Sequence, residues 1–421
     1  MPASARSART SSAVAIIGVL FFLFGFTTWI NGPLINYLKI ICQLEDGAEP
    51  FYVTSAFYIA YFVTALPMAW VLGRTGMKNG MMYGLFVMAA GAFCFIPAAQ
   101  GRSYPLFLLG LFLLGTGLSL LQTASNPYIT VVGPIESAAA RISVMGICNK
   151  MGGFIAPFVI GFLLMGDADS LLEELAGLHG AAHAARLDEI AQRVIMPYSV
   201  MGVALIALGL MIRFSPLPEL DPQVDAPGVA TDGRGLFSFP NLVLGAIALF
   251  LYVGVEVMAG DTIGTYAQSQ GMGLGDAKHL TSYTLACMIV GYIIGIICIP
   301  RFLSQSKALA GSAISGVVIT LAAISLKGLP SVLCIALLGL ANALVWPAIW
   351  PLAIEGLGRH TKAGGALLIM AIAGGAVLPP LYGHLAKYPG IGHQQAYWIM
   401  VPCYLFILWY GLKGHKRKSW A

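Results

Sequence analysis

The chain has 421 residues, of which 58% are hydrophobic and only 10% are charged, with a mean hydropathy of +0.82. Soluble domains carry about 25% charged residues, so this composition excludes an ordinary soluble enzyme and a disordered protein. A net charge of +5 is too small for a basic surface that binds nucleic acid. The class that remains is a polytopic helical protein embedded in a lipid bilayer.

Twelve apolar stretches, each long enough to cross a bilayer, follow one another along the chain. We expect them at residues 13–40, 51–73, 79–99, 104–132, 140–166, 195–214, 238–269, 280–300, 308–326, 329–355, 363–386 and 393–413. The predicted fold is therefore all-α, with twelve transmembrane helices.

The basic residues predict which way the helices lie in the membrane. An even number of spans places both termini on one side, and fifteen of the 23 Lys and Arg residues fall on that side. Seven fall on the opposite side, and Lys150 lies inside a span. Basic loops stay in the cytoplasm, so we expect both termini to be cytoplasmic.

Two polar stretches divide the chain. Residues 167–194 are helix-prone and mildly amphipathic, and they lie outside, between spans five and six. Residues 215–237 are rich in Pro and Asp and form a cytoplasmic linker between spans six and seven. A polar linker at the middle of twelve spans indicates two six-helix bundles, here residues 1–214 and 238–421.

The two halves share a sequence pattern. Gly152 to Gly161 in span five reads G-G-x3-P-x3-G, and so does Gly374 to Gly383 in span eleven, 222 residues later. Pro127 and Pro347 lie 220 residues apart in spans four and ten. Parallel six-span repeats predict a major facilitator architecture, with the substrate between the halves near the middle of the membrane.

Three charged residues fall deep within spans, where a charge costs at least about 2.5–3.5 kcal/mol on insertion scales. They are Lys150 in span five, and Glu256 and Asp261 in span seven. For Glu256 two interpretations stay open: a carboxylate that couples transport to a proton or Na⁺, and a structural ion pair with Lys150. Asp261 lies further toward the outside, where it either assists coupling or is an ordinary solvated carboxylate at the outer mouth.

Amide and aromatic side chains in the spans suit the hydroxyl groups and C–H faces of a sugar. The candidates for substrate binding are Asn31, Gln122, Asn126, Asn149, Lys150, Tyr252 and Trp346. Amides also bond adjacent helices to each other, which is the alternative interpretation for any single one of them. No Walker loop, nucleophile elbow or metal-binding motif is present, so we expect no cofactor and no catalytic residue.

Several sequence segments resemble those of the fucose–galactose–glucose symporter family of the major facilitator superfamily. They are Phe24 to Pro33 in span one, Gly117 to Pro134 in span four, Arg141 to Lys150 in span five and Tyr252 to Glu256 in span seven. The resemblance covers nearly the whole chain and is closest to the glucose/galactose branch. Fucose/proton members carry an aspartate and a glutamate where this chain has Gly32 and Gln122. That difference implies coupling through another carboxylate, Glu256 first, or through Na⁺.

Together these features predict a monomeric secondary transporter that imports a hexose, glucose or galactose, by alternating access. Glu256 and Asp261 are the predicted ion-coupling residues, with a Na⁺ site at Glu256 preferred over a proton. The alternatives are a facilitative uniporter and a drug/proton exporter on the same fold, a sugar sensor without flux, and an intramembrane enzyme. The amide residues argue against the exporter, and no paired acids or metal ligands support the enzyme.

Overall fold

The computed structural model of the chain describes residues 3–131, 138–166, 168–215, 217, 235–299, 302–357, 360–417 and 419–420. Most of the described residues are helical, and no strand occurs among them. Twelve helical stretches are long and apolar enough to cross a membrane, which confirms the predicted number of spans. Residues 218–234 of the predicted linker lie outside the described part of the chain.

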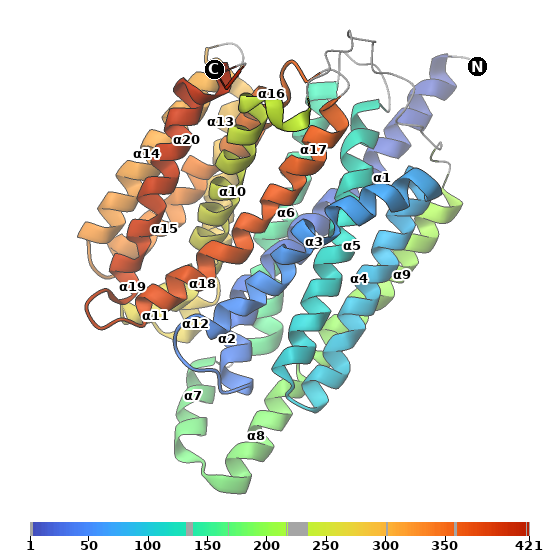
Figure 1. Cartoon of the computed structure of the whole chain (residues 1–421). Helices are drawn as coiled ribbons and strands as arrows, with labels where there is room; N and C mark the ends of the chain where they lie inside the picture. The colour runs from blue at the N-terminus through green and yellow to red at the C-terminus, as the bar shows by residue number, and fades with distance from the viewer. Residues whose placement is uncertain are drawn as a thin grey trace.

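The helices form two side-by-side bundles, coloured blue to green and yellow to red in Figure 1. The first bundle contains α1 (Ala3–Trp29), α2 (Asn31–Ile41), η1 (Glu49–Phe51), α3 (Tyr52–Thr75), α4 (Met77–Gln100), α5 (Tyr104–Val131), α6 (Ala138–Met165), α7 (Ala168–Gly177), α8 (Gly180–Gln192) and α9 (Ile195–Phe214). Both chain ends lie at one end of the molecule, and α7 and α8 project from the opposite end (Figure 1).

The second bundle contains η3 (Leu236–Ser238), α10 (Pro240–Asp261), α11 (Ile263–Ser269), α12 (Leu274–Ala277), α13 (Leu280–Cys298), α14 (Gln305–Ser325), α15 (Leu329–Asn342), α16 (Val345–Ile354), α17 (Thr361–Met370), η5 (Ala371–Ala373), α18 (Gly374–Ala386), α19 (Gly392–Gln395), η6 (Ala396–Ile399), α20 (Met400–Leu412) and η7 (Gly414–Lys416). Predicted spans one, seven and ten are thus each broken into two helices, at Ile30, at Thr262 and at Ala343–Leu344. Spans eleven and twelve are divided as well, by the 3-10 segments η5 and η6.

The repeated glycine pattern marks equivalent helix contacts in the two bundles. A Cβ atom at Gly152 of α6 would overlap the carbonyl oxygen of Phe22 on α1, the first helix of its bundle. A Cβ atom at Gly374 of α18 would overlap the carbonyl oxygen of Phe250 on α10, the first long helix of the second bundle. Small residues let membrane helices approach this closely, so the two halves use the same packing device.

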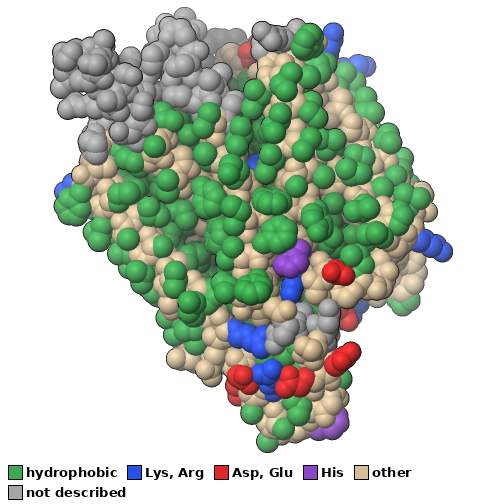
Figure 2. All heavy atoms as spheres, turned by 180° about the vertical axis from the view of Figure 1, so that it is seen from behind, with side chains coloured by type: hydrophobic (Ala, Val, Ile, Leu, Met, Phe, Trp, Pro, Cys, Tyr) green, Lys and Arg blue, Asp and Glu red, His purple; other side chains and the backbone are tan. Residues whose placement is uncertain are grey.

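The outer face of the bundles suits lipid. Large apolar side chains such as Leu66, Phe162 and Val203 are exposed. Figure 2 shows hydrophobic side chains over most of the visible surface, with charged groups gathered near the α7–α8 end. There Arg102 forms an ion pair with Asp188 of α8, and Arg186 with Glu174 of α7. The chain is a multi-pass membrane protein with an apolar surface that faces lipid.

Candidate functional site

A buried ion pair joins the two bundles, between the middle of α6 and the last part of α10. The ammonium nitrogen of Lys150 on α6 lies 2.9 Å from Oε1 of Glu256 on α10. Each residue is only 8% exposed. A lone charge in this apolar setting is costly, and each partner neutralises the other. Glu256 therefore points into the junction between the bundles and not at lipid.

Aromatic rings surround the ammonium group of Lys150. The nitrogen lies 5.5 Å from the ring centroid of Trp29 on α1 and 6.0 Å from that of Tyr292 on α13. A cation over an aromatic face gains further electrostatic stabilisation. Tyr252, a predicted substrate residue, is fully buried one turn before Glu256 on α10. Sequence reasoning missed Tyr292, because a tyrosine within an apolar helix carries no signal of its own.

The predicted amide residues whose side chains the structure describes form no hydrogen bonds with one another; each bonds to a neighbouring helix or turn. Asn31 is completely buried and donates to the carbonyl of Thr28 in the preceding turn. Asn149 donates to the carbonyl of Phe21, which ties α6 to α1. Gln122 of α5 donates to the hydroxyl of Tyr61 on α3, at 3.1 Å. The side chain of Asn126 lies outside the described residues.

Trp346 lies at the start of α16, directly after the break in the tenth span. Its ring stacks on that of Trp350, with 5.5 Å between centroids and 25° between planes. Both rings are half-buried. Trp346 thus offers a partly accessible aromatic face, whereas Asn31 and Tyr252 offer no exposed surface.

Asp261 is buried, contrary to the expectation of a solvated carboxylate at an outer mouth. Only 2% of the residue is exposed, at the point where α10 ends. Its Oδ2 accepts a hydrogen bond from Thr54 Oγ1 of α3, at 3.1 Å, so this contact also joins the two bundles. Hydropathy places Asp261 near a span end but gives no sign that another helix covers it.

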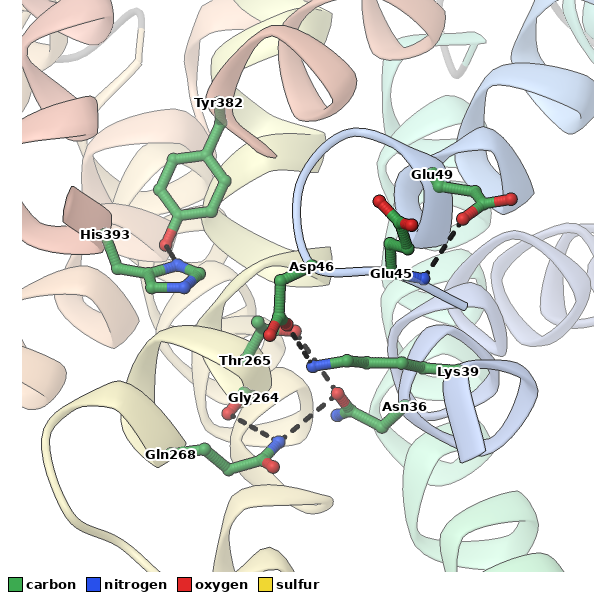
Figure 3. Close-up of polar contacts among 10 residues, drawn as sticks. All are labelled: Asn36, Lys39, Glu45, Asp46, Glu49, Gly264, Thr265, Gln268, Tyr382 and His393. Carbon is green, nitrogen blue, oxygen red and sulfur yellow. Dashed lines mark hydrogen bonds and ion pairs between the residues drawn. The ribbon is translucent and has the colours of Figure 1, made fainter. Parts of the chain in front are cut away.

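The bundles are joined at the end that carries α7 and α8. Asn36 of α2 accepts hydrogen bonds from Thr265 and Gln268 of α11, both at 3.2 Å (Figure 3). Lys387 of the second bundle lies 3.3 Å from Glu45 of the first. None of these residues stood out in the sequence, because single polar residues near a span end are ordinary.

Two further contacts involve lysines near this end. Lys278 donates to the carbonyl of Met165 at the end of α6, which joins the bundles again. Within the first bundle, Lys39 lies 2.5 Å from Asp46 (Figure 3), and this hydrogen bond lowers the pKa of the Asp46 carboxyl. The α7–α8 end is therefore closed by polar contacts from several helices of both bundles.

Gly32, where the fucose/proton resemblance implies an aspartate, leaves no space for one. A Cβ atom there would lie 2.5 Å from the hydroxyl oxygen of Thr281 on α13. That hydroxyl donates to the carbonyl of Gly260, at 2.8 Å. Position 32 is thus a contact between the bundles in this chain.

A match to a family model agrees with this architecture of two bundles and twelve spans. Residues 17–380 match the model described as Major Facilitator Superfamily. The chain belongs to this superfamily. The predictions of fold and superfamily are confirmed. Since its relatives are transporters, it is not an enzyme.

The relatives of this superfamily member include sugar transporters. It is 34% identical to the glucose/galactose transporter of Brucella abortus, over 96% of this chain and 94% of that protein. It is 28% identical to the L-fucose-proton symporter of Haemophilus influenzae, over 95% and 96% of the two chains. The predicted resemblance to that family of symporters is confirmed.

Solved structures support the same fold. The crystal structure of the transporter FucP in the outward conformation has a TM-score of 0.73 and 27% identity, covering 94% of this chain and 97% of FucP. The inward-open xylose transporter XylE of E. coli has a TM-score of 0.69 at 14% identity, covering 97% and 98%. At that identity the likeness to XylE shows the fold alone.

Proposed function

We propose that this superfamily member is a secondary active transporter that imports a hexose, glucose or galactose, by alternating access. The observation that carries the proposal is the buried Lys150–Glu256 pair, which joins the two bundles within their apolar helices. Intramembrane charges of this kind mark substrate and ion pathways. The names of the relatives, glucose/galactose transporter and L-fucose-proton symporter, supply the substrate class.

We propose a proton as the coupling ion, in place of the Na⁺ that the sequence favours. The Oε1 atom of Glu256 already lies 2.9 Å from an ammonium group, which would repel a second cation beside it. Relatives named as proton symporters support the same choice. Glu256 contributes to coupling through its pair with Lys150. The two residues belong to different bundles, so movement of the bundles changes the distance between them.

For the sugar, we propose contacts from the half-buried members of the predicted set. Gln122, Asn149 and Trp346 keep accessible surface, and Lys150 adds a donor beside them on α6. Asn31 and Tyr252 are fully buried, so we place them outside the surface that contacts the sugar. Asn126 stays a proposed contact on the basis of its place in span four.

We propose that both termini face the cytoplasm of a bacterial-type cell, in its inner membrane, and that the α7–α8 end faces outward. The excess of basic residues on the side of the termini supports this orientation. The bundles then comprise residues 1–214 and 238–421, joined by a cytoplasmic linker at 215–237. The two halves of one chain enclose the transport path, so a monomer suffices.

Counterflow into proteoliposomes tests the proposal. Vesicles preloaded with unlabelled glucose or galactose should take up the labelled sugar, and an inward proton gradient should drive accumulation above equilibrium. An inward Na⁺ gradient alone should not. Counterflow without accumulation under any gradient would indicate a uniporter, and efflux of amphipathic drugs without sugar flux would indicate an exporter.

A pair of tryptophan variants tests the sugar site. Trp346→Ala should raise the KM for sugar about tenfold, because the aromatic surface on which the sugar stacks is lost. Buried or half-buried tryptophans often dominate binding energy. Trp398→Ala is the matched control, since Trp398 is exposed near the outer end of another span. Equal effects of the two changes on KM would remove Trp346 from the site.

A further inference from the structure

Asp261 differs from Glu256, the other buried acid among the described residues, by its lack of a cationic partner. Thr54 Oγ1 donates to its Oδ2, whereas Oδ1 is buried and has no hydrogen-bond partner among the described residues. Within those residues no Lys, Arg or His forms an ion pair with Asp261. Glu256, in contrast, has the ammonium group of Lys150 at 2.9 Å.

The surroundings of Asp261 favour the neutral acid. The titratable groups that face it are Glu256, further back on α10, and Tyr58 on α3, and neither supplies a positive charge. An ionised carboxylate with one hydrogen bond and no countercharge is expensive in an apolar interior. A carboxylic acid in the same place leaves only a neutral oxygen unsatisfied, which costs far less.

The position of Asp261 links this protonation to the closure of the outer end. Thr54 belongs to the first bundle and Asp261 to the second, so their contact exists only while the bundles are together. Four residues further along, Thr265 of α11 bonds to Asn36 in the outer contact of Figure 3. Opening the outer end must therefore separate Thr54 from Asp261 and admit water to the carboxyl group.

We propose that Asp261 is the site that binds the transported proton, and that its protonation is required before the outer end closes. This inference rests on the proposed proton-coupled transport. In the outward-open state, external water gives a proton to the ionised Asp261 carboxylate, and an O–H bond forms on one of its oxygens. After closure, the same O–H bond breaks when water reaches the unpartnered Oδ1 from the cytoplasmic side, and the proton leaves on that water.

Asp261→Asn, which mimics the permanently neutral acid, gives the first test. Sugar counterflow should stay within about twofold of wild type, because a neutral residue 261 still permits closure. Proton-driven accumulation and the sugar-evoked alkalinisation of the external medium should both be lost. The matched control is Asp276→Asn, an exposed acid on the same side of the molecule, which should keep both.

Thr54→Val gives an independent test that does not change the acid. It removes the one hydrogen bond that the Asp261 carboxyl accepts, so the buried ionised form becomes less favourable still. Because the contact exists only in the closed state that releases the proton inward, the internal pH of half-maximal uptake should rise by about one unit, whereas the external pH profile should stay unchanged. A merely structural role for the contact would lower the maximal rate without moving the pH profile.

The outcomes separate this inference from the proposed function. If Asp261→Asn keeps sugar-evoked proton uptake, or if wild-type uptake follows Na⁺ without proton movement, the proton site is overturned while sugar transport stands. If wild type moves no hexose, the proposed function fails, and infrared spectra of the purified protein decide the site alone. The carbonyl band of a protonated carboxylic acid should then disappear in Asp261→Asn and persist in Asp276→Asn; its persistence in both would overturn the site. If Asp261→Asn transports poorly because it folds poorly, the same infrared comparison decides whether Asp261 carries the proton.

Discussion

At the Lys150–Glu256 pair, each charge is tolerated only because the other lies beside it. Lys150→Met and Glu256→Gln should each lower stability by about 3–5 kcal/mol, because each leaves an uncompensated buried partner. The double variant should melt close to wild type, since no unpaired charge then remains. Thermal unfolding in detergent measures this, and a double variant less stable than both singles would contradict a pair of this kind.

The buried charged residues differ in how well the sequence predicts their surroundings. The partnership of Lys150 with Glu256 is predictable, because a deep cation and a deep anion in an apolar chain need each other. The burial of Asp261 is not, because it depends on Thr54 of α3, some 200 positions away in sequence. Hydropathy reports how apolar a stretch is and not which helix of the other bundle packs over it.

At the scale of the helix, the spans follow from apolar runs but their breaks do not. Within span seven, α10 ends at Asp261 and α11 begins at Ile263. The residue at the break, Thr262, is neither proline nor glycine. The Thr262 hydroxyl instead bonds to the carbonyl of Met258 and to the hydroxyl of Tyr397. Such a break is fixed by tertiary hydrogen bonds, which a reading of local pattern cannot supply.

The glycine repeat yields a prediction about helix packing. Gly374→Ala should lower stability by about 1–3 kcal/mol, since its methyl group would meet the carbonyl oxygen of Phe250 and push α18 away from α10. Gly311→Ala on the exposed face of α14 is the matched control, with open space around its Cβ position, and should be neutral or slightly stabilising. Thermal melting of both variants gives the comparison; equal melting temperatures would show that the close approach is not needed.

At the scale of the whole molecule, the contacts between bundles gather polar residues at the α7–α8 end. Asn36 with α11, Lys278 with Met165, and Glu45 with Lys387 all cross from one bundle to the other there. The two-bundle architecture follows from the linker and the repeat, but the closure of the α7–α8 end could not be predicted. The closed end belongs to one conformation, and a transporter must adopt at least two. One sequence encodes both conformations, without showing which contacts belong to which conformation.

If this closure must open in each cycle, tying it shut should stop transport. Glu45→Cys with Lys387→Cys, in a background without the seven native cysteines, places two thiols where side chains of opposite bundles meet. A short bifunctional maleimide should then abolish counterflow while each single variant keeps it. Lys39→Cys with Asp46→Cys joins two positions within the first bundle, so its crosslinking should leave counterflow largely intact. Full counterflow with Glu45 and Lys387 positions crosslinked would mean that the two bundles do not separate at this end during transport.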